Sequence, residues 1–208
     1  DATDVITDKG LSTDVDTVIM PYQLSKYTLP TGIEQGTISA GTQASSLTGN
    51  DSDNTLTGND GANALVGAVG RDSLFGGLGD DALNGGSGDD VLEGGVGNNN
   101  LTGGTGSDSF VFDAALKASV DNITDFKPID DTIKLENQIF TKLTVPGVLD
   151  ASQFVKGQNA LDPNDVVIYN PTTGTVTYDS DGSGAGFGIQ IAMLGVNLAI
   201  TNADFSVI

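Results

Sequence analysis

One acidic or amide residue in every nine recurs through the middle of the chain. From Gly49 to Val111 the sequence divides without insertion into seven units of nine residues, and the sixth residue of each unit is Asp or Asn. These seven residues are Asn54, Asn63, Asp72, Asp81, Asp90, Asn99 and Asp108. Their carboxylate and amide oxygens suit hard cations, whereas the softer metals lack their usual ligands because the chain has no Cys and no His. The spacing therefore predicts oxygen-ligated cation binding.

These residues lie in units that share a fixed pattern of glycine and apolar residues. Each unit opens with Gly, and the eighth residue is large and apolar: Leu56, Leu65, Leu74, Leu83, Leu92, Leu101 and Phe110. A repeat this short predicts a solenoid. In each unit we expect the first six residues to form a Gly-rich turn and the last three to form a strand with one inward side chain. Two units complete a coil, so strands eighteen residues apart pair in a parallel sheet at about 4.8 Å. One sheet would bury Leu47, Leu65, Leu83 and Leu101, and the other Leu56, Leu74, Leu92 and Phe110.

Stacked coils place the ligand residues in two columns. Asn54, Asp72, Asp90 and Asp108 form one, and Asn63, Asp81 and Asn99 form the other. Bare carboxylates at about 5 Å repel by about 3 kcal/mol at an effective dielectric constant near 20. A cation between the coils makes the electrostatic interaction attractive, and the turns add backbone carbonyl oxygens as ligands. Such flexible oxygen sites suit Ca²⁺ better than Mg²⁺. The alternative is a flexible Gly/Asp linker, which the composition permits but which does not explain leucine in constant register.

The nine-residue units resemble the RTX repeat of bacterial proteins exported by type I secretion. The resemblance implies a parallel β-roll with several Ca²⁺ ions between turns on the same edge. It also implies that each ion takes side-chain oxygens from sixth positions, carbonyls from the second and fourth positions of one turn, and carbonyls from the first and third positions of the turn above. The chain departs from the pattern at Asn50, Asn59 and Ala68, where the second Gly is missing, and at Ser52.

Carried over, this scheme puts the strongest site between Asp72 and Asp90 and the next between Asp90 and Asp108. Sites that pair an Asn with an Asp have one carboxylate each and should bind more weakly. Asp125, with Asp131, would close a terminal site, although an ordinary acid at a strand end is an equal alternative. The predicted metal ligands are Asn50, Ser52, Asn54, Asn59, Gly61, Asn63, Gly67, Ala68, Val69, Gly70, Asp72, Gly76, Gly77, Leu78, Gly79, Asp81, Gly85, Gly86, Ser87, Gly88, Asp90, Gly94, Val96, Asn99, Gly103, Thr105, Asp108 and Asp125.

The segments on either side of the repeats have ordinary β patterns. Residues 1–46 predict short strands near 16–20, 27–29 and 33–38, and they resemble the spacer between RTX blocks, read here as wider coils that cap the roll. Residues 113–208 predict a β-sandwich-like cap with a helical turn at 114–118 and strands at 123–126, 132–135, 187–194 and 205–208. They also predict a hairpin whose strands, 166–169 and 175–178, flank a five-residue loop. The expected fold is all-β, with domains at 1–46, 47–112 and 113–208.

The tail resembles the C-terminal domain that follows RTX blocks in secreted proteases, epimerases and rhizobial glycanases. The matching pieces are SDSFVF (107–112), ITDF (123–126), DDTIKL (130–135), VVIYNPTTGTVTYDSDGSG (166–184) and DFSVI (204–208). The last piece is similar to the uncleaved signal of type I export, and a plain edge strand is the alternative reading. The resemblance implies a secreted or surface-associated extracellular protein that the type I apparatus exports.

Composition narrows the classes of function. Acids outnumber bases by 28 to 8, for a net charge of −20, which argues against nucleic acid or an anionic membrane as partner. No stretch predicts a membrane span, and no nucleophile or phosphate-loop motif predicts an enzyme. We expect a calcium-binding module that folds on Ca²⁺ binding after export and serves as the C-terminal folding and secretion domain of a larger protein. The alternatives are an adhesin or polysaccharide-binding module, and the non-catalytic tail of a secreted protease, glycanase or epimerase.

Overall fold

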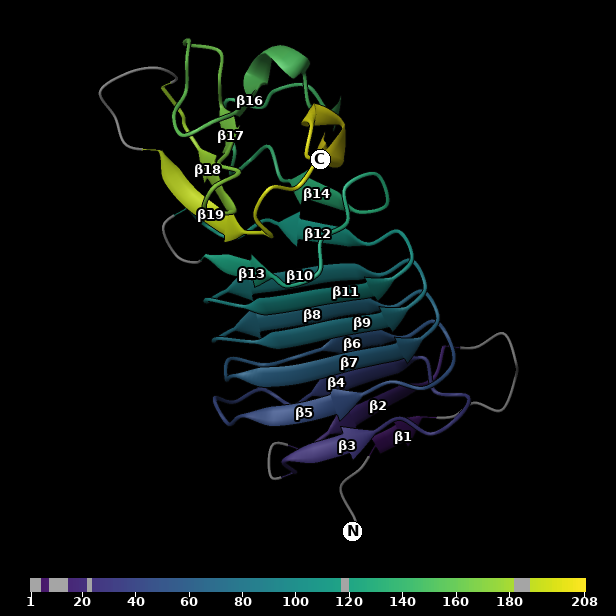
Figure 1. Ribbon diagram of the computed structural model, residues 1–208. Helices are drawn as coiled ribbons and strands as arrows, with labels where there is room; N and C mark the ends of the chain where they lie inside the picture. The colour runs from purple at the N-terminus through teal and green to yellow at the C-terminus, as the bar shows by residue number, and fades with distance from the viewer. Residues whose placement is uncertain (1–4, 8–14, 22–23, 117–119, 182–187) are drawn as a thin grey trace.

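Two facing β-sheets run the length of the molecule and form a flattened roll that opens at its C-terminal end (Figure 1). The computed structural model describes residues 5–7, 15–21, 24–116, 120–181 and 188–208. The first sheet contains β1 (Val5–Thr7), β2 (Thr17–Met20), β4 (Gln35–Ile38), β6 (Thr55–Thr57), β8 (Ser73–Leu78), β10 (Val91–Val96), β12 (Ser109–Phe112), β14 (Thr132–Leu135), β20 (Phe205–Val207) and β15 (Gly147–Val148), in that order.

The second sheet contains, in order, β16 (Phe154–Lys156), β17 (Val167–Tyr169), β18 (Thr175–Tyr178), β19 (Ile189–Met193), β13 (Asp121–Ile123), β11 (Asn100–Thr105), β9 (Ala82–Ser87), β7 (Asn63–Val69), β5 (Ser45–Thr48) and β3 (Lys26–Thr28). Two short 3₁₀ helices, η1 (Ala151–Gln153) and η2 (Asn202–Asp204), complete the described elements. Among the described residues, no helix has the length and apolar character needed to cross a bilayer.

The eighteen-residue coil predicted from the repeat is confirmed. Leu74 pairs with Leu92 in parallel β8 and β10, and Leu83 pairs with Leu101 in parallel β9 and β11. The predicted length of the strands was wrong. β8 to β11 each have six residues and continue through the opening Gly-Gly-x of the next unit, which confines the turn to the fourth to sixth positions. Glycine supports this extension because it lets neighbouring coils approach closely without a side chain.

A column of leucines fills the space between the sheets. Leu47, Leu56, Leu65, Leu74, Leu83, Leu92, Leu101 and Phe110 are all buried, with exposed fractions of 1% or less. Each contributes about 1.5–3 kcal/mol of hydrophobic free energy. Each of these strands contributes one large apolar side chain to the core, so the many ordered glycines must be balanced by another interaction as well.

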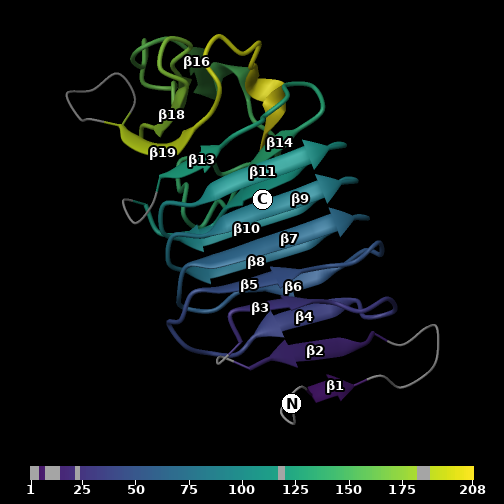
Figure 2. The same cartoon turned by 60° about the horizontal axis from the view of Figure 1, so that its bottom comes forward.

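The N-terminal segment extends both sheets below the repeats (Figure 2). Thr17 pairs with Gln35, eighteen residues later, but Gln35 pairs with Thr55 and Lys26 with Ser46, each twenty residues later. Both sheets continue through residue 46, so the proposed boundary there stays a prediction.

The C-terminal segment continues both sheets instead of forming a separate layer. β14 and β20 extend the first sheet in parallel, and β13 joins β19 in the second. The predicted hairpin of β17 and β18 is confirmed. The reading of residues 205–208 as an edge strand was wrong, because β20 lies between β14 and β15, with Phe205 and Val207 buried. The helical turn expected at 114–118 and the start of the strand expected at 187–194 fall partly outside the described residues.

Ala68 stands in a left-handed conformation with φ of 92°, where the equivalent residues of later units are glycines such as Gly86, with φ of 109°. This conformation costs an L-residue about 1–2 kcal/mol, against about 0.5–1 kcal/mol for the extra flexibility of glycine. Ala68→Gly should therefore raise the free energy of unfolding by about 0.5–1 kcal/mol, measured by urea denaturation at saturating calcium. Ala82→Gly, in regular strand β9, is the control and should lower it by about the same amount. A less stable Ala68→Gly protein contradicts the reading.

Candidate metal centres

The sixth-position side chains of one edge form a hydrogen-bonded ladder. The backbone N–H of Asn54 donates to Oδ1 of Asp72 at 2.7 Å, that of Asp72 to Asp90 at 2.8 Å, and that of Asp90 to Asp108 at 3.0 Å. The N–H of Asp108 donates to Oδ1 of Asp131 at 3.1 Å. Each carboxylate is thus held by the coil below it, with one oxygen engaged and its orientation fixed. The predicted column exists, and Asp131 extends it by one step.

The opposite edge has the same construction. The N–H of Asn63 donates to Oδ1 of Asp81 at 2.7 Å, and that of Asp81 to Oδ1 of Asn99 at 2.9 Å. The N–H of Asn99 donates to Oδ1 of Asp121 at 3.1 Å, so Asp121 tops this column. Our sequence reasoning missed Asp121 and the ladder role of Asp131. The signal was present, because each stands two positions before a buried Ile, Ile123 or Ile133, as in the repeats. Longer connections of 22 and 23 residues between paired strands hid the period.

Four carboxylate oxygens in these columns have no partner. Oδ2 of Asp72, Asp81, Asp90 and Asp108 are the buried side-chain N or O atoms without a hydrogen bond in the described part of the chain. Each of these residues is 1% exposed. A buried oxygen of this kind costs free energy unless a donor or a cation meets it, and native proteins rarely leave one unmet. Four such atoms at equivalent places in four of the seven repeats point to one common ligand.

Burial also shifts the proton affinity of these groups. It raises the pKa of Asp72, Asp81 and Asp108 from the ordinary value of 3.8 to about 6, against the opposing backbone hydrogen bond that each accepts. Burial raises the pKa of Asp90 as well, and the charge of neighbouring Asp89 adds to this. Without a cation, the fold therefore disfavours the charged form of every one of these carboxylates.

The opening glycines of some repeats, such as Gly67 and Gly85, leave room where these oxygens meet a carbonyl of the next coil. A Cβ on Gly67 would lie 2.3 Å from Oδ2 of Asp72 and 2.5 Å from the carbonyl oxygen of Gly85 in the next coil. A Cβ on Gly85 would lie 2.2 Å from Oδ2 of Asp90 and 2.7 Å from the carbonyl oxygen of Gly103. A carboxylate of one coil and a carbonyl of the coil above thus face one spot that no side chain can fill. All-oxygen ligands around such a spot suit Ca²⁺.

Backbone carbonyls supply further oxygens near these spots. Within the described ranges, no three His, Cys, Asp or Glu side chains come together as a metal-binding group. A Cβ on Gly88, with φ of 130°, would lie 1.8 Å from the carbonyl oxygen of Gly70, so the fourth-position carbonyls also face the next coil. A cation here would be held by one or two carboxylates and by main-chain oxygens.

Comparison with known families decides what this repeat is. The family model of the RTX calcium-binding nonapeptide repeat, described as four copies, matches residues 39–74, 57–92 and 75–110. Residues 39–110 are an RTX-type calcium-binding region. No curated protein matches the chain. Among solved structures, the AlgE6R3 subunit of the Azotobacter vinelandii mannuronan C5-epimerase is similar over 74% of this chain and 78% of that one, with 23% identity and a TM-score of 0.30.

In the first two nine-residue units, the side-chain oxygens of the sixth residues accept hydrogen bonds, unlike the unpartnered Oδ2 atoms of the later aspartates. Oδ1 of Asn54 accepts the N–H of Asn50 at 2.7 Å, and Oδ1 of Asn63 accepts that of Asn59 at 2.7 Å. Asn50 and Asn59 also close their own turns, because their Oδ1 atoms accept the N–H groups of Ser52 and Gly61 at 2.9 and 2.8 Å. The oxygens expected to bind metal here already have donors. Weak sites at this end stay predictions.

The remaining predicted ligands lie on the strands and turns of the roll, where they would act through main-chain carbonyls. The side chains of Val69, Leu78 and Val96 are exposed, in keeping with that role. Asp125 does not belong to either ladder. Its two oxygens accept the N–H groups of Gly103 and Gly104 at 3.0 and 2.9 Å.

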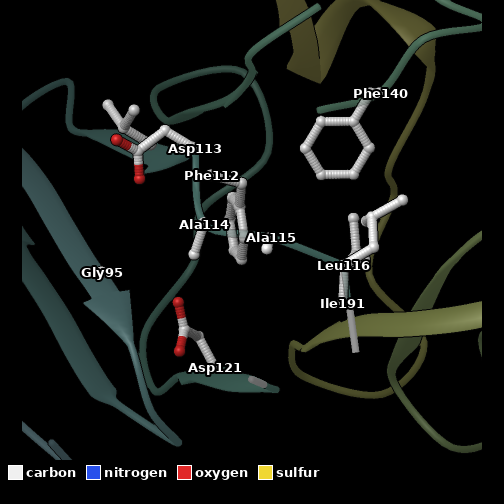
Figure 3. A pocket seen from close by; sticks show the side chains of 10 residues that line it. Gly95, Phe112, Asp113, Ala114, Ala115, Leu116, Asp121, Phe140 and Ile191 are labelled. Carbon is white, nitrogen blue, oxygen red and sulfur yellow. The ribbon is translucent and has the colours of Figure 1, made fainter. Parts of the chain in front are cut away.

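A pocket lies where the RTX roll meets the cap (Figure 3). The carboxylates of Asp113 and Asp121 lie on one side of it, and Phe140, Leu116 and Ile191 on the other. Burial raises the pKa of Asp121 to about 6, although hydrogen bonds from Asn99 oppose this shift. Burial and the neighbouring charge of Asp113 raise the pKa of Glu93 to about 7. Buried acidic side chains are thus found also where the roll packs against the apolar side chains of the C-terminal segment.

The pKa shifts predict how pH acts on the calcium-free protein. Carboxylates whose pKa is about 6 in the fold and near 3.8 when unfolded destabilise the fold above pH 6, and this loss disappears as the pH falls from about 6 towards 4. In chelator, acidification from pH 7 to 4.5 should therefore increase the β signal in circular dichroism. Asp81→Asn should weaken the response, and Asp60→Asn, at an exposed position, should leave it intact. A steady loss of β structure on acidification contradicts this reading.

Proposed function

We propose that this chain is a calcium-driven folding module, in which Ca²⁺ ions between successive coils of the RTX roll supply the free energy that keeps the roll closed. The observation that carries the proposal is the set of four buried, unpartnered oxygens on Asp72, Asp81, Asp90 and Asp108. An ion between coils would meet these oxygens and neutralise the stacked charge, so its binding free energy becomes folding free energy.

The strongest sites are those with a carboxylate from each coil. Asp72 and Asp90 form one such pair, and Asp90 and Asp108 form the next. The carbonyls of Gly85 and Gly103, which face these carboxylates, complete the set that the geometry supports best. Sites in extracellular calcium modules bind with dissociation constants of about 10⁻⁴–10⁻³ M. Such affinities leave the roll ion-free in calcium-poor cytosol and loaded outside the cell.

Circular dichroism of the full chain tests this proposal. We expect coil in chelator and β structure at millimolar calcium. Asp90→Asn removes a carboxylate shared by two sites and should raise the calcium midpoint about tenfold or more. Asp51→Asn, an equal change of charge at an exposed turn residue, should leave the midpoint unchanged. Full β structure in chelator, indifferent to added calcium, would refute the proposal.

We further propose that the module is a non-catalytic C-terminal part of a larger extracellular protein and that type I export carries it out of the cell. The support is the RTX-type repeat, together with the similarity of residues 204–208 to an export signal. An unfolded, highly acidic chain suits threading through a channel, and calcium outside then makes folding favourable.

Expression beside a type I exporter tests the export proposal. The chain should appear in the medium only when the exporter is present. A matched strain that lacks the exporter controls for lysis. Retention in the cytosol with a functional exporter present contradicts it.

A further inference from the structure

Backbone carbonyls of the second residues of the repeats form a row along the edge of the roll that carries Asp72, Asp90 and Asp108. A Cβ on Gly86 would lie 2.2 Å from the carbonyl oxygen of Ala68, and a Cβ on Gly104 would lie 2.0 Å from that of Gly86. Each second-position carbonyl therefore points into the gap below the next coil. The row ends at Gly104, because the coil above it belongs to the cap and has no nine-residue unit.

The carbonyl of Gly104 meets an ammonium group. Nζ of Lys127 donates to this oxygen. The backbone N–H of the same lysine donates to Oδ2 of Asp131 at 2.8 Å, which anchors the lysine beside the top of the Asp ladder. The chain's own cation thus stands at the place where the row of carbonyls and the column of carboxylates both end.

The charges around this place are strongly negative apart from Lys127. Asp131 accepts the N–H of Asp108, and Asp125 accepts the N–H groups of Gly103 and Gly104, so three carboxylates lie near this place, including the unpartnered Oδ2 of Asp108. Lys127 is one of only 8 basic residues among 208, and it lies at this edge of the roll.

We propose that the ammonium of Lys127 fills the last cation position of the Asp72–Asp90–Asp108 column and replaces a calcium ion there. This inference rests on the proposed function, because it assumes that the gaps below hold calcium. It revises the expectation that Asp125 and Asp131 close a terminal calcium site. The carboxylates are there, and Lys127 brings a tethered cation to the Gly104 carbonyl beside them. The cap end of the roll is then neutralised without an external ion, and calcium adds to a coil that is already in place.

The test compares the full chain with Lys127→Met, which keeps the aliphatic stem and removes the charge. At saturating calcium, equilibrium dialysis should find one more bound ion in the variant than in the wild type. The calcium midpoint for folding should rise by about twofold to fivefold, since that ion must now come from solution. Lys134→Met, on neighbouring β14, makes the same change in net charge and should leave both values unchanged. An unchanged stoichiometry or an unchanged midpoint in Lys127→Met overturns the proposal.

A second variant separates charge from hydrogen bonding. Lys127→Gln keeps a neutral donor, and it should behave like Lys127→Met. Wild-type behaviour in Lys127→Gln would mean that a neutral hydrogen bond explains the contact, and this overturns the proposal as well. The wild-type curve keeps the two proposals distinguishable. A wild-type chain that folds without calcium refutes the proposed function, whereas a normal wild-type curve with unaltered Lys127 variants refutes only the role of Lys127.

Discussion

Negative charge stacked inside a narrow roll is the constraint on which the rest of the structure depends. The Asp carboxylates of successive coils lie in register, are buried, and hold the coil below through one oxygen each. The other oxygen faces a spot kept open by glycine and shared with a carbonyl of the coil above. Each strand of the repeats contributes only one leucine or phenylalanine to the core behind them. A cation at these spots turns the largest source of repulsion in the fold into the contact that joins its coils.

The two ends of the RTX-type region avoid that dependence in different ways. At the N-terminal end, Asn54 and Asn63 stand in place of aspartates, and their side-chain oxygens accept backbone N–H groups from Asn50 and Asn59. At the C-terminal end, the column passes to Asp131, and Lys127 supplies a positive charge. On this account, calcium is needed in the middle of the roll, whereas the N-terminal end uses side-chain amides and the C-terminal end adds the charge of Lys127.

The repeat predicted a large part of this arrangement because period, core and ligand share one spacing. Leucine every nine residues was enough to predict the pairing of Leu74 with Leu92, and the Asp column followed from it. The predictions that failed mostly concern individual residues outside the regular repeat. Asp121 and Asp131 follow the same rule as the repeat residues, but insertions hide them. The contact of Lys127 with Gly104 could not be predicted either, because it depends on where a non-repeating segment folds back. The place of β20 inside a sheet was missed because it is set by long-range pairing with β14.

Anomalous diffraction from crystals grown with calcium, measured at long wavelength, tests the central claim most directly. The account predicts peaks between the coils, beside Oδ2 of Asp72 and Asp90 and the carbonyls of Gly85 and Gly103. It also predicts no peak in the gap beside Nζ of Lys127. An ordered roll without anomalous density beside Asp72 or Asp90 would contradict the account.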